Sequence, residues 1–141
     1  MDVHQELLRP VVALAAWTMV MWAWMYATRL PAMRAARMKP DPDAPRGEQM
    51  ATLPPRVRWK ADNYNHLMEQ PTVFYPVATV LALVSTDAGT DAALAWAYVA
   101  LRVVHSIFQA VVNKIEVRFG LFVLSSLALV AMIARAVLSL A

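Results

Sequence analysis

Two apolar segments of this chain carry ionisable and amide side chains at helical spacing. On the first segment these side chains are Asp62, His66 and Glu69, and on the second they are Arg102, His105, Gln109 and Asn113. At 100° per residue, each set falls on one face of a helix. Ionisable groups are costly in a bilayer, so they usually face a bundle interior or a wet cavity and mark a functional site. We therefore expect the acids to pair with Arg and His groups across the bundle.

Two other interpretations of these side chains stay open. The polar groups could be interhelical contacts that only hold the bundle together. His66, Glu69 and His105 could instead bind a divalent metal, because imidazole and carboxylate groups are both suitable ligands. An intramembrane His more often hydrogen-bonds across helices, so the sequence favours no metal site.

The overall composition places these residues in a membrane protein. The chain has 141 residues, of which 60% are hydrophobic and only 16% are charged, with a mean hydropathy of +0.45. A soluble domain has about a quarter of its residues charged. The length allows a single domain, residues 1–141, with about four spans of ~20 residues. We predict an all-α fold, specifically an integral membrane four-helix bundle.

The apolar runs predict where the four spans lie. They cover residues of about 8–29, 58–85, 92–113 and 119–140. A basic, Pro-rich loop at 30–57 joins the first two spans, because its six prolines cannot continue a helix. Pro71 and Pro76 should bend the second span.

The Lys and Arg residues predict the orientation of the spans. Eight of the thirteen lie between Arg29 and Lys60. Lys114 and Arg118 fall on the same side of the membrane, so the positive-inside rule puts this side in the cytoplasm and both termini away from it. Arg135, near the end, can snorkel to the opposite interface. Because the basic residues flank apolar segments, we expect membrane lipids as partners and no nucleic acid.

Specific sequence motifs resemble one family of membrane proteins. Residues 61–75, ADNYNHLMEQPTVFY, are similar to the second-helix signature of the MAPEG family, the membrane-associated proteins of eicosanoid and glutathione metabolism. Residues 102–106, RVVHS, resemble its third-helix motif, and Arg118 matches the Arg that opens its fourth helix. The Ala-Asp-Asn opening is similar to that of bacterial members, which implies a multi-pass protein of a bacterial inner membrane.

The resemblance implies a fold, an assembly and a ligand. It implies a four-helix protomer, a homotrimer, and glutathione bound between neighbouring subunits near the cytoplasmic face. Glu69 then corresponds to the acid that holds the glutathione amino group, and Arg118 to the catalytic arginine that favours the thiolate. The remaining residues that it places around glutathione are Asn63, His66, Arg102, His105 and Gln109. The nucleophile would be the sulfur of glutathione, because the chain itself has no Cys.

The function implied is that of a glutathione-dependent transferase or peroxidase acting on a lipophilic electrophile. Three positions depart from the family's pattern. The family's Asn falls at His66, and the eicosanoid enzymes have Arg where this chain has Asp62 and Tyr where it has Gln109. An acid at position 62 would repel a glutathione carboxylate. The alternative is therefore a non-catalytic binding or scaffold protein of the same fold, in which the polar groups only fasten the trimer.

Overall fold

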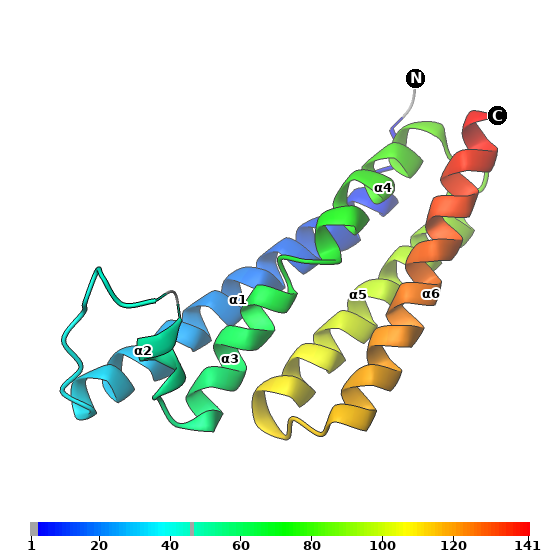
Figure 1. Cartoon of the computed structure of the whole chain (residues 1–141). Helices are drawn as coiled ribbons and strands as arrows, with labels where there is room; N and C mark the ends of the chain where they lie inside the picture. The colour runs from blue at the N-terminus through cyan, green and yellow to red at the C-terminus, as the bar shows by residue number, and fades with distance from the viewer. Residues whose placement is uncertain (1–2, 46) are drawn as a thin grey trace.

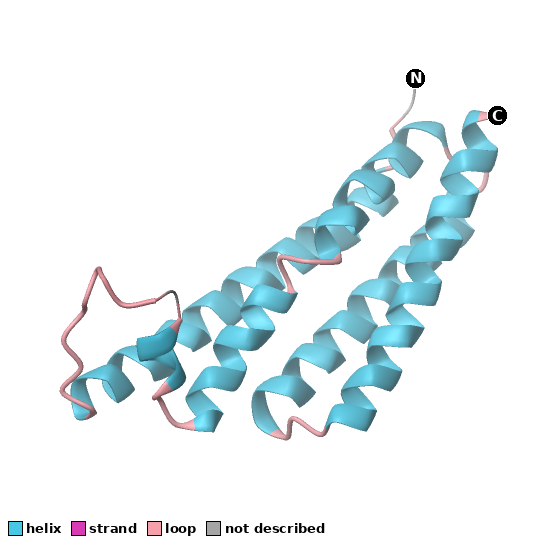
Figure 2. Ribbon diagram, viewed as in Figure 1, coloured by secondary structure: helices cyan, strands magenta, loops and turns pink. Residues whose placement is uncertain are grey.

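The protein is built from helices, and the longer ones lie side by side along the molecule (Figure 1). The computed structural model describes residues 3–45 and 47–141. Its helices are α1 (Gln5–Ala35), α2 (Glu48–Ala51), α3 (Pro55–His66), α4 (Pro71–Val84), α5 (Ala88–Val111) and α6 (Ile115–Leu140). Those described residues contain no strand (Figure 2). Four segments are long and apolar enough to cross a membrane, namely α1, α3 together with α4, α5 and α6. The predicted all-α fold with four spans is confirmed.

Helix α1 extends beyond the span of about 8–29 that the hydropathy pattern indicates. It continues through Pro31 to Ala35. Pro31 removes one backbone donor, but the surrounding residues 32–36 are three alanines, a Met and an Arg, which are strong helix formers. The connector between the first two spans is correspondingly shorter than the expected loop at 30–57, and it contains the one-turn helix α2.

The second span is broken rather than bent. Helix α3 ends at His66 and α4 begins at Pro71. Pro71 lacks a backbone N–H, and its ring would crowd the carbonyl group four residues earlier, so it favours a new helix start over a continuation through residues 67–70. In this turn the Glu69 N–H donates to the His66 carbonyl oxygen at 3.4 Å. This is an i→i−3 bond, which closes a tighter turn than the i→i−4 bond of an α-helix. At Pro76, by contrast, α4 continues without interruption.

Apolar side chains at heptad spacing hold the helices together. Leu7, Leu14 and Met21 of α1 are fully buried, and α1 packs against α3, α4 and α5. Phe74 of α4 stacks on Tyr98 of α5 with 4.6 Å between ring centroids. These contacts fix α4 against α5 and so determine the level at which the α3–α4 turn meets α5.

An ion-pair cluster closes the end of the bundle where both termini lie (Figure 1). Asp91 is fully buried, accepts a hydrogen bond from the Ser85 hydroxyl at 2.5 Å, and pairs with Arg135. Arg135 also lies 3.7 Å from Asp87. Hydrogen bonds from Thr90 lower the pKa of Asp87, which caps the start of α5. Arg135, expected to snorkel to the interface, thus connects the last part of α6 with the start of α5.

Candidate functional site

A cavity at the opposite end of the bundle collects several of the predicted site residues. It has a volume of about 370 Å³ and lies where α3, α5 and α6 meet. We call it the His–Arg cavity, and its lining residues are His66, His105, Ile115, Arg118, Phe119 and Phe122. Three of the six are therefore the imidazole and guanidinium groups that the sequence singled out.

The break before Pro71 positions two of the polar groups. His66 is the last residue of α3, and Glu69 lies in the following turn. The His66 Nδ1 atom is 2.8 Å from Glu69 Oε2, while the Glu69 side chain stays 66% exposed. The helical spacing that placed these residues on one face does not apply, because the helix ends between them. Their pairing comes from the turn.

Arg102 is fully buried inside the protomer. Its Nη2 atom donates to the His66 carbonyl oxygen at 2.9 Å. This contact satisfies an end carbonyl of α3, where a cation is favourable. The expected pairing of Arg102 with an acid across the bundle is not formed among the described residues. Its Nε and Nη1 atoms have no hydrogen-bond partner in that part of the chain.

His105 and the aromatic wall lie against His66. The rings of His66 and His105 have centroids 5.1 Å apart, and the His66 and Phe122 ring centroids are 5.7 Å apart. His105 is almost fully buried, whereas His66 is partly exposed. The two imidazoles therefore form one side of the His–Arg cavity, with Phe122 beside them.

Arg118 enters the cavity from the first turn of α6. Its Nη1 atom donates to Asn113 Oδ1 at 2.6 Å. Asn113 follows α5 in the left-handed region, with φ of 59°, which Asn tolerates better than most residues. The tight α5–α6 link thus holds the Arg118 side chain in place. The buried Nε atom of Arg118 has no partner among residues 3–45 and 47–141.

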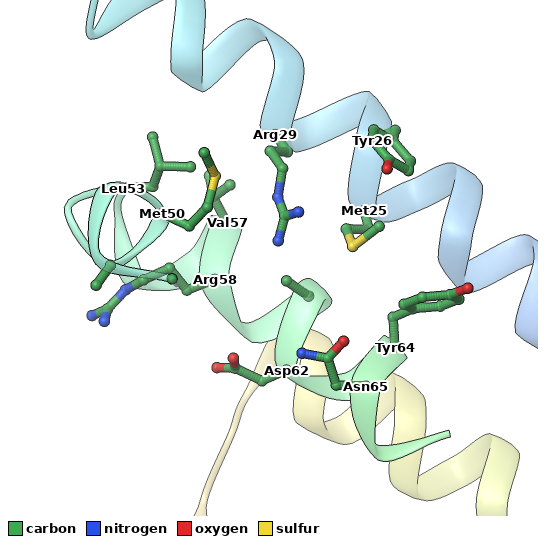
Figure 3. A pocket seen from close by; sticks show the side chains of 13 residues that line it. Met25, Tyr26, Arg29, Met50, Leu53, Val57, Arg58, Asp62, Tyr64 and Asn65 are labelled. Atoms are coloured by element: carbon green, nitrogen blue, oxygen red, sulfur yellow. The ribbon is translucent and has the colours of Figure 1, made fainter. Parts of the chain in front are cut away.

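The other predicted site residues, which are Asn63, Glu69, Arg102 and Gln109, do not line the His–Arg cavity, and neither does Asp62. Asn63 and Gln109 are buried between helices, and each has a side-chain oxygen without a partner in the described chain. Asp62 instead lines a second cavity between α1, α2 and α3 (Figure 3). The structure therefore separates His66, His105 and Arg118, which line the His–Arg cavity, from the other predicted residues.

The sequence reasoning missed the apolar part of the cavity. Ile115, Phe119 and Phe122 line it together with Arg118. The available signal was the spacing on the fourth span, because Phe122 follows Arg118 by one helical turn and so shares its face. The metal alternative gains no support, since no group of three His, Cys, Asp or Glu side chains in the described chain could hold a metal ion.

The fold and the cavity define a multi-pass integral membrane protein with a cationic, partly aromatic site at one end of its bundle. Comparison with known families matches residues 7–138 to the MAPEG family. The chain therefore belongs to the MAPEG family, which includes glutathione-dependent transferases and peroxidases as well as non-catalytic members. No curated protein and no solved structure matches the chain.

Proposed function

We propose that this protein is a glutathione-dependent membrane enzyme of the transferase or peroxidase type, acting on a lipophilic electrophile. The observation that carries the proposal is that Arg118 shares a cavity with two imidazoles and two phenyl rings. The volume of about 370 Å³ lies in the range of small-molecule sites, roughly 300–1,000 Å³. A fixed cation beside apolar walls suits a reaction in which negative charge develops away from water.

The residues present fit the chemical groups of glutathione, which carries two carboxylates, an ammonium and a thiol. Buried N–H groups of Arg102 and Arg118 have no partner among the described residues and can donate hydrogen bonds to an anionic group. Glu69 offers an exposed carboxylate for the ammonium. Asp62, which would repel a carboxylate, lines the other cavity and does not line this one.

Each of these residues would have a separate role. The thiol of glutathione would supply the nucleophile that a chain without Cys lacks. Arg118 would stabilise negative charge at the sulfur, because a guanidinium stays protonated at neutral pH. Glu69 would hold the amino group, and His66 orients the Glu69 carboxylate through the 2.8 Å contact.

The lipophilic partner would enter from the bilayer side. Ile115 is 74% exposed and Phe119 is 65% exposed, although both belong to a candidate membrane span. Both line the cavity as well. A hydrophobic electrophile dissolved in the membrane can therefore reach the site along an apolar surface without crossing water.

The proposed assembly is the family's homotrimer. Glu69 is exposed on one protomer, and a charge facing the hydrocarbon of the membrane costs at least a few kcal/mol. A neighbouring subunit would cover it. Arg102 gives no such reason, because the protomer buries it completely.

Replacement of Arg118 tests the enzyme proposal. Arg118→Leu should lower turnover of a lipophilic electrophile by about 10²–10³-fold, because lost transition-state contacts of this kind have that effect. Glutathione binding should change much less. Arg118→Lys should recover only part of the rate, since an ammonium keeps the charge but loses the planar fork. Steady-state kinetics on detergent-purified protein measure both.

The matched control is Arg34→Leu, because Arg34 is exposed in the last turn of α1 and lines neither cavity. Its turnover should equal that of wild type. The enzyme proposal fails if wild type shows neither turnover on a panel of electrophiles nor glutathione binding by calorimetry. The non-catalytic alternative would then be preferred, and the contacts of Arg102 and Arg118 within the protomer favour it in that case.

A further inference from the structure

The second cavity lies between the end of α1, α2 and the start of α3, and we call it the connector cavity (Figure 3). Its volume is about 480 Å³. The polar side chains that line it are Tyr26, Arg29, Arg58, Asp62, Tyr64 and Asn65. It shares no residue with the His–Arg cavity. A ligand bound in the connector cavity would therefore be separate from one bound in the His–Arg cavity.

The length of the uncharged run in α1 fixes the depth of this cavity in the membrane. Residues 10–28 contain no charged side chain, and Arg9 and Arg29 bound them. At 1.5 Å per residue these positions span ~28 Å, close to the ~30 Å hydrocarbon thickness of a bilayer. Arg29 thus lies at the level of the lipid headgroups, at the end of the molecule that carries the basic connector.

The cavity presents both signs of charge without pairing them. The Arg29 side chain extends from α1 into the space facing α3, and Asp62 and Asn65 lie on α3 (Figure 3). Ion pairs among the described residues involve only Glu69, His66 and the Arg135 cluster. Arg58, one turn before Asp62, adds a second guanidinium at the exposed rim. Such a site suits a ligand with one anionic and one cationic group.

The apolar surroundings indicate that this ligand has a hydrocarbon tail. Met25, Leu53 and Ala61 are buried beneath the polar groups. An exposed stripe of large side chains leads from the cavity toward the middle of the membrane along one face of α1. Its members are Met19, Trp22, Tyr26 and Leu30, between 39% and 56% exposed, at spacings of three and four residues.

We propose that the connector cavity binds a membrane phospholipid whose headgroup carries a phosphate and a primary ammonium, as in phosphatidylethanolamine. Arg29 binds the phosphate, because guanidinium groups match phosphate geometry, and Arg58 adds a positive charge at the rim. Asp62 binds the ammonium, and the acyl chains lie on the α1 stripe. A choline headgroup lacks N–H donors for Asp62 and Asn65. A glycerol headgroup leaves the Asp62 carboxylate without a counter-charge.

Native mass spectrometry of the full-length protein, with equal amounts of three lipids of identical acyl chains, tests the proposal. Wild type should retain phosphatidylethanolamine at least ~5-fold more than phosphatidylcholine or phosphatidylglycerol, a difference of about 1 kcal/mol. Arg29→Gln should lower retention of all phospholipids at this site. Asp62→Asn should remove the preference for the ethanolamine headgroup while phospholipid retention persists. Arg34→Gln, on the same helix but outside the cavity, should behave as wild type.

The remaining outcomes decide against the proposal. It is overturned if wild type shows no headgroup preference, or if Arg29→Gln retains phospholipid like the control. If soluble glycerophosphoethanolamine is retained as well as the phospholipid, the cavity binds a free phosphate and amine rather than a lipid. Displacement of the lipid by glutathione would show that the connector cavity belongs to the glutathione site. None of these results depends on electrophile turnover, which tests the enzyme proposal separately.

Discussion

Single side chains around the α3–α4 turn make structural contacts and keep further hydrogen-bonding groups unused in the described chain. Arg102 satisfies the last carbonyl of α3 with one nitrogen and leaves two others without partners in the described chain. Glu69 accepts from His66 and yet stays 66% exposed. Both groups therefore retain hydrogen-bonding capacity after the protomer has folded, and this spare capacity is what a ligand would use.

Glu69 provides the test at this scale. Glu69→Gln should weaken glutathione binding by about 10- to 100-fold, because a hydrogen bond between charged groups contributes about 1.5–3 kcal/mol. The rate constant for bound substrate should change little, since the ammonium is held equally in the ground and transition states. Calorimetry and steady-state kinetics separate the two quantities.

The control for this variant is Glu116→Gln, an exposed acid in the first turn of α6 that lines neither cavity. It should bind glutathione like wild type. Equal affinities for Glu69→Gln and wild type would show that Glu69 does not hold the amino group.

At the scale of elements, the break between α3 and α4 is the feature that assembles the site. It turns Glu69 back toward His66 and exposes the His66 carbonyl to Arg102. A continuous helix would use that carbonyl in its own i→i−4 ladder. The α5–α6 hairpin contributes the other half, through the left-handed Asn113 that receives Arg118.

Restoring helix continuity should therefore damage the site without unfolding the protein. Pro71→Ala allows α3 and α4 to join, so that the Gln70 N–H would take the His66 carbonyl and Arg102 would lose this contact. Glutathione binding should fall by ~10–100-fold, because a hydrogen bond to a charged group contributes about 1.5–3 kcal/mol. Helix content by circular dichroism should be kept. Pro76→Ala, inside the uninterrupted α4, is the matched control, and an equal effect of both variants would contradict this role of the break.

Two properties belong to the whole molecule, and the first is its orientation. Both termini lie at one end, and the basic connector lies at the other (Figure 1). The positive-inside rule then places the termini away from the cytoplasm. A reporter that works only in the cytoplasm should be inactive when fused at residue 141 and active when inserted near residue 43. The opposite pattern would reverse the proposed topology.

The second property is assembly. Protein extracted in mild detergent should have about three times the mass of the 15.7 kDa chain, after subtraction of bound detergent. The reason is that Glu69 remains exposed on one protomer and needs a neighbour to exclude lipid. Light scattering or native mass spectrometry measures this. Monomers alone, at concentrations where glutathione binds, would rule out a site shared between subunits.

The sequence alone determined the class of the protein, its four spans and the end of the bundle where the polar residues gather. Hydropathy and charge bias are local properties, because a bilayer requires each span to be apolar and helical by itself. The motifs at residues 61–75 and 102–106 also sufficed to predict the family, which the match over residues 7–138 confirms.

Only the tertiary structure decided which polar groups meet. Arg135 and Asp91 are 44 residues apart and pair because α5 and α6 are antiparallel. Asp62 and His66 lie one turn apart on α3 but line different cavities, because α1 and α2 cover the face of α3 near Asp62. Helical periodicity predicts the face on which a side chain lies. Its partner depends on the register and packing of a distant helix, which no local pattern contains.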